Sequence, residues 1–219
     1  MSYRLAIFDF DGTLADSWPF FMSVFNEIAD QHGFRRVDAA QAEQLRHYGP
    51  RDIMRHVGMP AWKLPIASRS FIDRMRGATG RIALFDGIAH TLRELDRNGV
   101  RLAVVSSNAE DNVRDVLGPE LATLVGHYEC GMSIFGKAAR IRKVVRRATV
   151  PAVQALYVGP DYRWRRRAPG RDRVRGGRLG LCVDRIAAPG GAGARVRDTG
   201  RFAVARRIGV CPPRNCPHA

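Results

Sequence analysis

The chain has 219 residues, of which 45% are hydrophobic, enough for one substantial core with a smaller inserted module. No apolar run approaches the roughly 18–20 residues of a membrane span. Residues 1–13 lack the basic start and the cleavage site of a signal peptide. The four cysteines are too few for a disulfide framework at this length. The composition therefore argues against a membrane protein and predicts a reducing, cytoplasmic setting.

The net charge of +15 is distributed unevenly along the chain. Residues 160–219 contain 15 Arg, 4 Asp and neither Lys nor Glu, a net charge of +11, whereas residues 1–159 carry only +4. A basic charge spread over a whole domain would favour nucleic-acid binding. Here the basicity belongs to the last 60 residues, so the two parts of the chain are interpreted separately.

The first part opens with a short apolar run, Arg4–Asp9, of the length expected for a buried strand. Gly12 predicts a turn directly after it. A helix is expected from Asp16–Ser17 to Gly33, and helical patterns continue to about residue 83 without a convincing strand. These patterns predict a small helical module over residues 15–83. Its breaks are expected at Gly49–Pro50, at Gly58–Pro60 and at Gly77.

Strands and helices alternate from residue 84 to residue 159, which favours a parallel sheet with helices on both faces. The prediction is an α/β core formed by residues 1–14 and 84–159 and split by the helical insert. The last 60 residues have no sustained period and are expected to be irregular. Strands are predicted at Arg101–Val105 and Ala155–Val158, and helices at Ile88–Leu95, Asp111–Leu117 and Ala139–Arg147.

The segment FDFDGTLADS, residues 8–17, carries the strongest functional signal. Two carboxylates, Asp9 and Asp11, follow an apolar strand, and the carboxyl ends of strands are where α/β sheets bind ligands. Asp9 is a candidate nucleophile toward phosphorus. Asp11 lies on the following turn and is a candidate general acid and base. Gly12 would expose backbone amides to a phosphate.

This segment resembles the first motif of the haloacid dehalogenase (HAD) superfamily, especially its phosphoglycolate phosphatase-like branch. The resemblance implies a doubly wound parallel sheet and a helical cap, residues 15–83, that closes over the site. It also implies that Phe10, Gly12 and Thr13 contact the substrate.

A second segment, VVSSN at residues 104–108, ends a predicted strand. In the order of the family's motifs, Ser106 matches the residue that binds a phosphoryl oxygen, and Ser107 and Asn108 could add polar contacts. Polar residues after a strand are also typical of a helix N-cap, so Asn108 has that alternative interpretation.

Lys137 matches the family's third motif, where one ammonium offsets the repulsion between a phosphate dianion and Asp9. The neighbouring Arg140, Arg142 and Lys143 are interpreted as the solvated face of the helix that follows.

In the helical insert, Arg46, His47 and Arg51 are candidates to bind a substrate carboxylate. The alternative is that all three are exposed helix-end residues. The aromatic side chains of the insert are interpreted as cap core rather than as ligand contacts. They are Phe20, Phe21, Phe25 and Trp62.

The chain departs from the family after the strand that ends at Gly159. The family's fourth motif supplies acids that hold Mg²⁺, a cation that prefers oxygen ligands. Here Pro160 replaces the first acid, and the later acid is missing. The predicted metal ligands are therefore Asp9, Asp11 and Asp161, with arginines at 163 and 165–167 opposing the ion.

The tail has the composition of a GC-rich gene translated in a shifted frame. Permitted codons for residues 170–184, translated one nucleotide later, allow AGIAFGAVAWGYAS, which resembles the stretch that follows the fourth motif. We therefore hypothesise a frameshift near Gly159–Pro160. The alternative is a functional arginine-rich segment that binds nucleic acid through phosphate contacts and base stacking.

The resemblance implies Mg²⁺-dependent hydrolysis of a small phosphorylated metabolite through an aspartyl-phosphate on Asp9. Because the fourth motif is broken, we expect this reaction to be impaired. Two alternatives stay open: a non-catalytic HAD-like protein that binds phosphate, and a nucleic-acid binder that acts through its basic tail.

Overall fold

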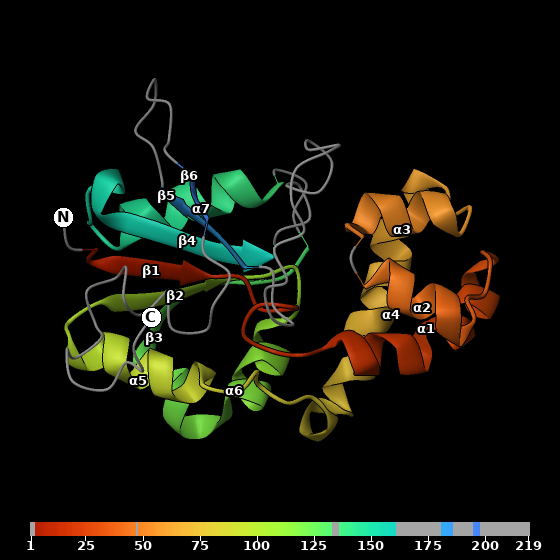
Figure 1. Ribbon diagram of the computed structural model, residues 1–219, viewed down its shortest axis with the longest axis horizontal. Coiled ribbons are helices and arrows are strands. Elements are labelled where there is room, and N and C mark those ends of the chain that lie inside the picture. The colour runs from red at the N-terminus through yellow and green to blue at the C-terminus, as the bar shows by residue number, and fades with distance from the viewer. Residues whose placement is uncertain (1–2, 47, 133–135, 161–180, 186–194, 198–219) are drawn as a thin grey trace, which may run out of the picture.

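A six-stranded sheet with the strand order β3-β2-β1-β4-β5-β6 organises the fold (Figure 1). The computed structural model describes residues 3–46, 48–132, 136–160, 181–185 and 195–197. Strands β3, β2, β1 and β4 are parallel, which confirms the predicted α/β sheet, whereas β5 and β6 pair antiparallel. The strands are β1 (Leu5–Phe8), β2 (Arg101–Val105), β3 (Val125–Glu129), β4 (Ala155–Pro160), β5 (Leu181–Arg185) and β6 (Arg195–Arg197).

Helices cover both faces of the sheet, because the central strands have apolar side chains on both sides. In Figure 1, α7 lies above the sheet, and α5 and α6 lie below it. The helices are α1 (Trp18–His32), α2 (Ala39–Leu45), α3 (Pro50–His56), α4 (Leu64–Arg76), α5 (Ile88–Arg97), α6 (Glu110–Leu124) and α7 (Gly136–Arg147). Short 3₁₀ turns occupy Ala61–Lys63, Thr79–Arg81 and Ala152–Gln154.

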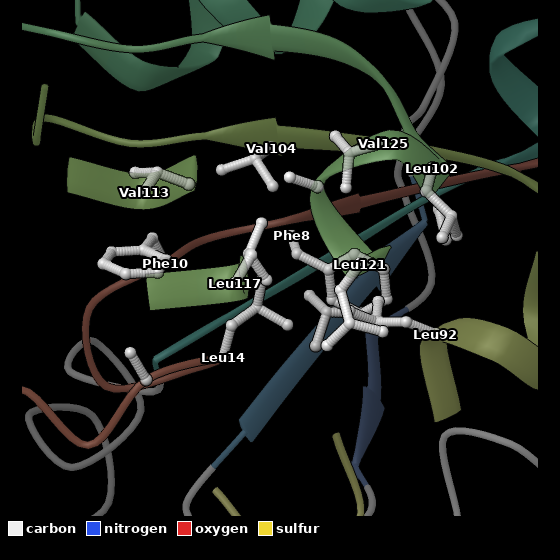
Figure 2. Close-up of a cluster of buried hydrophobic side chains, with 14 of the residues drawn as sticks. Phe8, Phe10, Leu14, Leu92, Leu102, Val104, Val113, Leu117, Leu121 and Val125 are labelled. Atoms are coloured by element: carbon white, nitrogen blue, oxygen red, sulfur yellow. The ribbon is translucent and has the colours of Figure 1, made fainter. Parts of the chain in front are cut away.

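The larger core cluster lies between the sheet and helices α5 and α6 (Figure 2). Alternate residues of each strand point to it, so Leu102 and Val104 of β2 meet Leu117 and Leu121 of α6 there. The other strand residues, such as Ile7 and Ala103, pack with Val144 and Val145 of α7 in a second cluster. The period of two along each strand thus divides its side chains between two cores.

Helices α1 to α4 pack around a third cluster that includes Phe25, Leu45 and Val57. The Phe21 ring stacks on the Phe71 ring with centroids 4.3 Å apart. In Figure 1 these helices group beyond the ends of the parallel strands. The helical content predicted for this interval is confirmed, including the end of α1 at Gly33, which adopts a left-handed conformation with φ 63°. The division into cap and core at residues 15–83 stays a prediction.

Two of the four aromatic residues interpreted as cap core lie elsewhere. Phe20 is buried in the larger cluster between the sheet and helices α5 and α6, rather than in the cluster among helices α1 to α4. Trp62 is 67% exposed, because it lies on a short 3₁₀ turn at the surface. Phe21 and Phe25 do belong to the helical cluster.

Two adjacent segments connect the helical group to the sheet. The Asp16 amide donates to the Ala83 carbonyl at 2.9 Å, and the Phe85 amide donates to the Leu14 carbonyl at 3.0 Å. A β-bridge joins Ala15 and Leu84 between them. The chain therefore leaves and re-enters the α/β core at one place.

Most of the tail lies outside the described residues. This holds for Asp161 and for the arginine-rich segment interpreted as a shifted frame or a nucleic-acid binder. Within the part of the chain that the structure describes, none of the helices has the length and hydropathy of a membrane span.

The packing of β2 against α6 predicts the cost of truncating a core side chain. Leu102→Ala should lower the free energy of unfolding by about 2–5 kcal/mol, because it removes buried methyl groups and leaves a cavity. Ile66→Ala, at a side chain that is half exposed, should change it by much less. Equal effects of the two substitutions in urea titrations would contradict this packing.

Candidate active site

The Asp9 carboxylate lies at the carboxyl end of β1, in the middle of the parallel sheet. The Asp9 amide continues the pairing of β1 with β4 by donating to the Val158 carbonyl at 2.8 Å. The residue is only 6% exposed, and each of its carboxylate oxygens accepts a hydrogen bond from within the protein. Oδ1 accepts from the Phe10 amide at 2.9 Å, and Oδ2 accepts from Lys137 Nζ. These two contacts compensate for the burial of the charge.

Lys137 reaches Asp9 from the first turn of α7, 128 residues later in the chain. Its ammonium also lies 5.9 Å from the centroid of the Tyr157 ring, on β4. The Lys137 side chain remains 42% exposed, so a ligand could approach it from solvent. The predicted pairing of this lysine with the site is thus present as a direct ion pair.

A tight turn follows Asp9 and carries Asp11 away from the strand. The Phe10 carbonyl accepts amides of Thr13, Leu14 and Ala15 at 2.9–3.1 Å. Gly12 has φ 72°, a left-handed conformation that glycine adopts without strain. The predicted turn at Gly12 is confirmed.

The side chains of Phe10 and Thr13 are not positioned to bind a ligand, although both were predicted substrate contacts. Phe10 is fully buried in the cluster beneath the sheet (Figure 2). Its amide already donates to Asp9. Thr13 is also buried, and its Oγ1 has no hydrogen-bond partner among the described residues. Both residues belong to the tight turn after β1, which packs against the core, and a sequence motif does not show which of its side chains point inward.

Burial of the Asp11 carboxyl raises its pKa from 3.8 to about 6, and the charge of Asp9 adds to the rise. Hydrogen bonds from Ser17 and Asn108 oppose it, because they stabilise the ionised form. A carboxyl group with a pKa near 6 exchanges protons readily close to neutral pH. That property fits the predicted role of Asp11 as general acid and base.

Ser106 and Asn108 follow β2, and the Asn108 side chain reaches the Asp11 carboxylate. Ser106 is buried, and its Oγ accepts the Asn108 amide at 3.0 Å. Asn108 Nδ2 lies 3.3–3.4 Å from the Asp11 carboxylate oxygens. Ser107 is exposed beside them. The N-cap of α6 is Ala109 rather than Asn108, although the Asn108 side chain accepts the Ala109 amide at 2.9 Å.

Sequence reasoning missed the contacts that connect this site to helix α4. Asn108 Nδ2 lies 2.9 Å from Met75 Sδ, and Asn112 Nδ2 donates to the Ile72 carbonyl at 2.9 Å. The two asparagines are themselves joined at 3.0 Å. The available signal in the sequence was Asn112, four residues after Asn108, because helical spacing places these two asparagines on one face.

Of the basic residues proposed for the helical insert, the two that the structure describes, Arg46 and Arg51, form no hydrogen bond or ion pair with Asp9. Arg46 forms an ion pair with Asp16 at 3.2 Å, in the segment that connects the sheet to α1. Arg51 is exposed at the start of α3, and within the described part of the chain it has no hydrogen bond to a site residue. His47 lies outside the described residues. Arg51 therefore stays a prediction as a substrate contact.

The carboxylates of Asp9 and Asp11 are the type of ligand that Mg²⁺ prefers. The described residues nevertheless include no group of three or more His, Cys, Asp or Glu placed to hold a metal ion. The last residue of strand β4 is Pro160, and proline has no side-chain oxygen that could bind a metal ion. The described donors thus fit Mg²⁺ only in part, and the third predicted ligand, Asp161, lies outside them.

The fold and this arrangement agree with sequence comparisons. Residues 6–163 match the haloacid dehalogenase-like hydrolase family, and the chain belongs to that family. It is 29% identical over 158 residues to a phosphoglycolate phosphatase of Synechococcus elongatus, covering 72% of this chain and 74% of that one. It is also 33% identical over 118 residues to the tyrosine-protein kinase PtkA of Mycobacterium tuberculosis, covering 53% and 40%.

Solved structures share the fold. A putative phosphoglycolate phosphatase from Lactobacillus plantarum superimposes with a TM-score of 0.61 at 21% identity, covering 72% of this chain and 77% of that one. CbbY from Rhodobacter sphaeroides in complex with phosphate gives 0.55 at 24% identity, covering 71% and 76%.

The raised pKa of Asp11 predicts a pH-dependent effect on stability. Since its pKa is higher in the folded protein, the wild type should lose stability as the pH rises from about 4 through about 6. Asp11→Asn removes this loss, so the variant should gain stability over the wild type across that interval. Urea titrations in EDTA measure the difference.

Asp96→Asn is the matched control, because Asp96 is exposed in the last turn of α5. A variant at Asp11 whose stability follows the wild type at every pH would contradict the desolvation of this carboxyl group.

Proposed function

We propose that the chain hydrolyses small phosphomonoesters of the phosphoglycolate type through an aspartyl-phosphate on Asp9. The main support for this proposal is the buried Asp9 carboxylate, which accepts hydrogen bonds from Lys137 and from the Phe10 amide. A second carboxyl group, Asp11, has a pKa near 6 and lies on the next turn. A nucleophile and a separate acid/base are what hydrolysis through a covalent intermediate requires.

In the first step, a carboxylate oxygen of Asp9 attacks phosphorus, and the bond from phosphorus to the leaving oxygen breaks. Protonated Asp11 donates its proton to that oxygen, so the leaving group departs as a neutral alcohol. Lys137 and the Ser106 hydroxyl stabilise the charge on the transferred phosphoryl group. The products of this step are the alcohol and an aspartyl-phosphate.

In the second step, Asp11 is ionised and takes a proton from an attacking water molecule. The water oxygen forms the new bond to phosphorus, and the acyl-phosphate bond to Asp9 breaks. Inorganic phosphate leaves, and both carboxyl groups return to their initial states. A pKa near 6 suits Asp11 to both directions of proton transfer.

Magnesium is the proposed cofactor, with Asp9, Asp11 and Asp161 as its ligands. When bound, the ion would neutralise negative charge on the phosphate. Pro160 stands where the family has an acid, and the described donors are too few for a complete site. We therefore propose that the ion binds weakly and that turnover is impaired.

A non-catalytic phosphate-binding protein is the second candidate, favoured by the incomplete donor set beside an intact Asp9–Lys137 pair. The shifted reading frame and the nucleic-acid tail stay predictions, since both depend on residues that are not described.

Turnover of phosphoglycolate and p-nitrophenyl phosphate tests the proposal. The wild type should release phosphate slowly with Mg²⁺ and stop when EDTA is added. Asp9→Asn should abolish release, because the amide cannot act as the nucleophile, whereas the exposed Asp96→Asn should not. Phosphate release that survives Asp9→Asn would exclude the proposed mechanism.

Pro160→Asp tests the impairment by supplying the missing carboxylate. We expect it to raise the Mg²⁺-dependent rate by at least about tenfold, which corresponds to roughly 1.4 kcal/mol in the barrier. It should also strengthen Mg²⁺ binding measured by calorimetry. Pro160→Asn controls for the loss of proline. Equal rates and equal Mg²⁺ affinities of the two variants would show that position 160 does not limit the site.

A further inference from the structure

Arg140 lies one turn after Lys137 on α7, and its side chain points back to the sheet rather than to solvent. Its guanidinium donates hydrogen bonds to four backbone carbonyl oxygens. Nη1 donates to Ser106 at 2.7 Å and to Glu129 at 3.5 Å, and Nη2 donates to Cys130 at 3.3 Å and to Gly131. This contradicts the interpretation of Arg140 as part of a solvated helix face.

These carbonyls belong to the points where two parallel strands end. Ser106 directly follows β2, and Glu129 is the last residue of β3. Backbone carbonyls at such ends need partners outside the sheet when water has limited access to them. A guanidinium has five donors in a planar fork, so it can satisfy several carbonyls at once. A lysine ammonium has no such fixed geometry.

The two loops are also bonded to each other. The Ser106 amide donates to the Glu129 carbonyl at 3.2 Å, and the Gly131 amide donates to the Asn108 carbonyl at 2.6 Å. Arg140 therefore joins the N-terminal part of α7 to a pair of loops that carries Ser106 and Asn108. Lys137 lies one turn before Arg140, at the start of the same helix.

We propose that Arg140 is a positioning residue that sets the place of Lys137 relative to Ser106. The inference rests on the proposed function, in which those two side chains stabilise the same phosphoryl group. Arg140 itself does not touch Asp9 or the reacting atoms. It acts by holding the helix that carries the ammonium against the loop that carries the hydroxyl.

The other basic residues of α7 have different surroundings. Lys143 and Arg147 form ion pairs with the Glu129 carboxylate at 2.8 and 2.6 Å. These two pairs hold the body of the helix to β3, not its first turn to β2. Arg142 is exposed, which makes it the matched control for loss of a positive charge on the same helix.

The test compares Arg140→Ala, Arg140→Lys and Arg142→Ala in the full-length chain. Because a displacement of about 1 Å at a reacting group costs roughly 10²-fold in rate, we expect Arg140→Ala to lower kcat by about that factor. KM should change much less. Added guanidinium should restore part of the activity of Arg140→Ala. The kcat of Arg140→Lys should stay low, because an ammonium lacks the planar set of donors of a guanidinium. Arg142→Ala should match the wild type.

Hydrogen exchange supplies a readout that does not depend on turnover. The amides of Ser106 and Gly131 should lose protection in Arg140→Ala and keep it in Arg142→Ala. Lost protection with an unchanged kcat would show a merely structural role and overturn the proposal. Unchanged protection and unchanged kcat would overturn it as well.

The proposed function can fail separately from this inference. If the wild type hydrolyses nothing, binding of inorganic phosphate replaces turnover as the measurement. At least tenfold weaker binding by Arg140→Ala, but not by Arg142→Ala, would then still support the positioning role. Equal phosphate binding by all variants, or none by the wild type, would overturn it.

Discussion

The site depends on the burial of one negative charge at the end of the central strand. Asp9 follows β1, which is paired on both sides, so its carboxylate has little access to water. A buried carboxylate requires charged or hydrogen-bonding partners. The Phe10 amide supplies one from the adjacent turn, and Lys137 supplies the other from a helix that begins more than a hundred residues later. The fold must therefore bring α7 to β1 before the site can exist.

The packing of the core explains how that meeting is achieved. Alternate residues of β1 and β2 point to α7, whose Val144 and Val145 complete the cluster on that face. Apolar packing is not directional, so it holds the helix against the sheet without fixing its first turn. The hydrogen bonds of Arg140 to the ends of β2 and β3 are directional, and they fix the position of the start of α7 relative to these strands. Contacts of Asn108 and Asn112 with α4 connect the same loops to the helical group.

The central strands and the motif residues were predictable because each depends on a local pattern. The limits predicted for β2 match those observed, and the motif residues Lys137 and Asn108 reach Asp9 and Asp11 respectively. Strand β3 was missed, since its sequence, VGHYE, has neither alternation nor an apolar run. Helix α6 extends past its predicted end because it continues after a kink at Gly118. The direction of Arg140 could not be predicted, because the carbonyls that it binds lie at the ends of β2 and of β3, the strand that was missed.

The most direct test of the account is to look for the covalent intermediate on Asp9. The protein would be mixed with p-nitrophenyl phosphate and Mg²⁺, quenched in acid within the first turnover, digested and examined by mass spectrometry. We predict one added phosphoryl group on the peptide that contains Asp9, removed by hydroxylamine and absent from Asp9→Asn. Phosphate release by the wild type with no phosphorylated peptide, or with the group on another residue, would contradict the role assigned to this buried carboxylate.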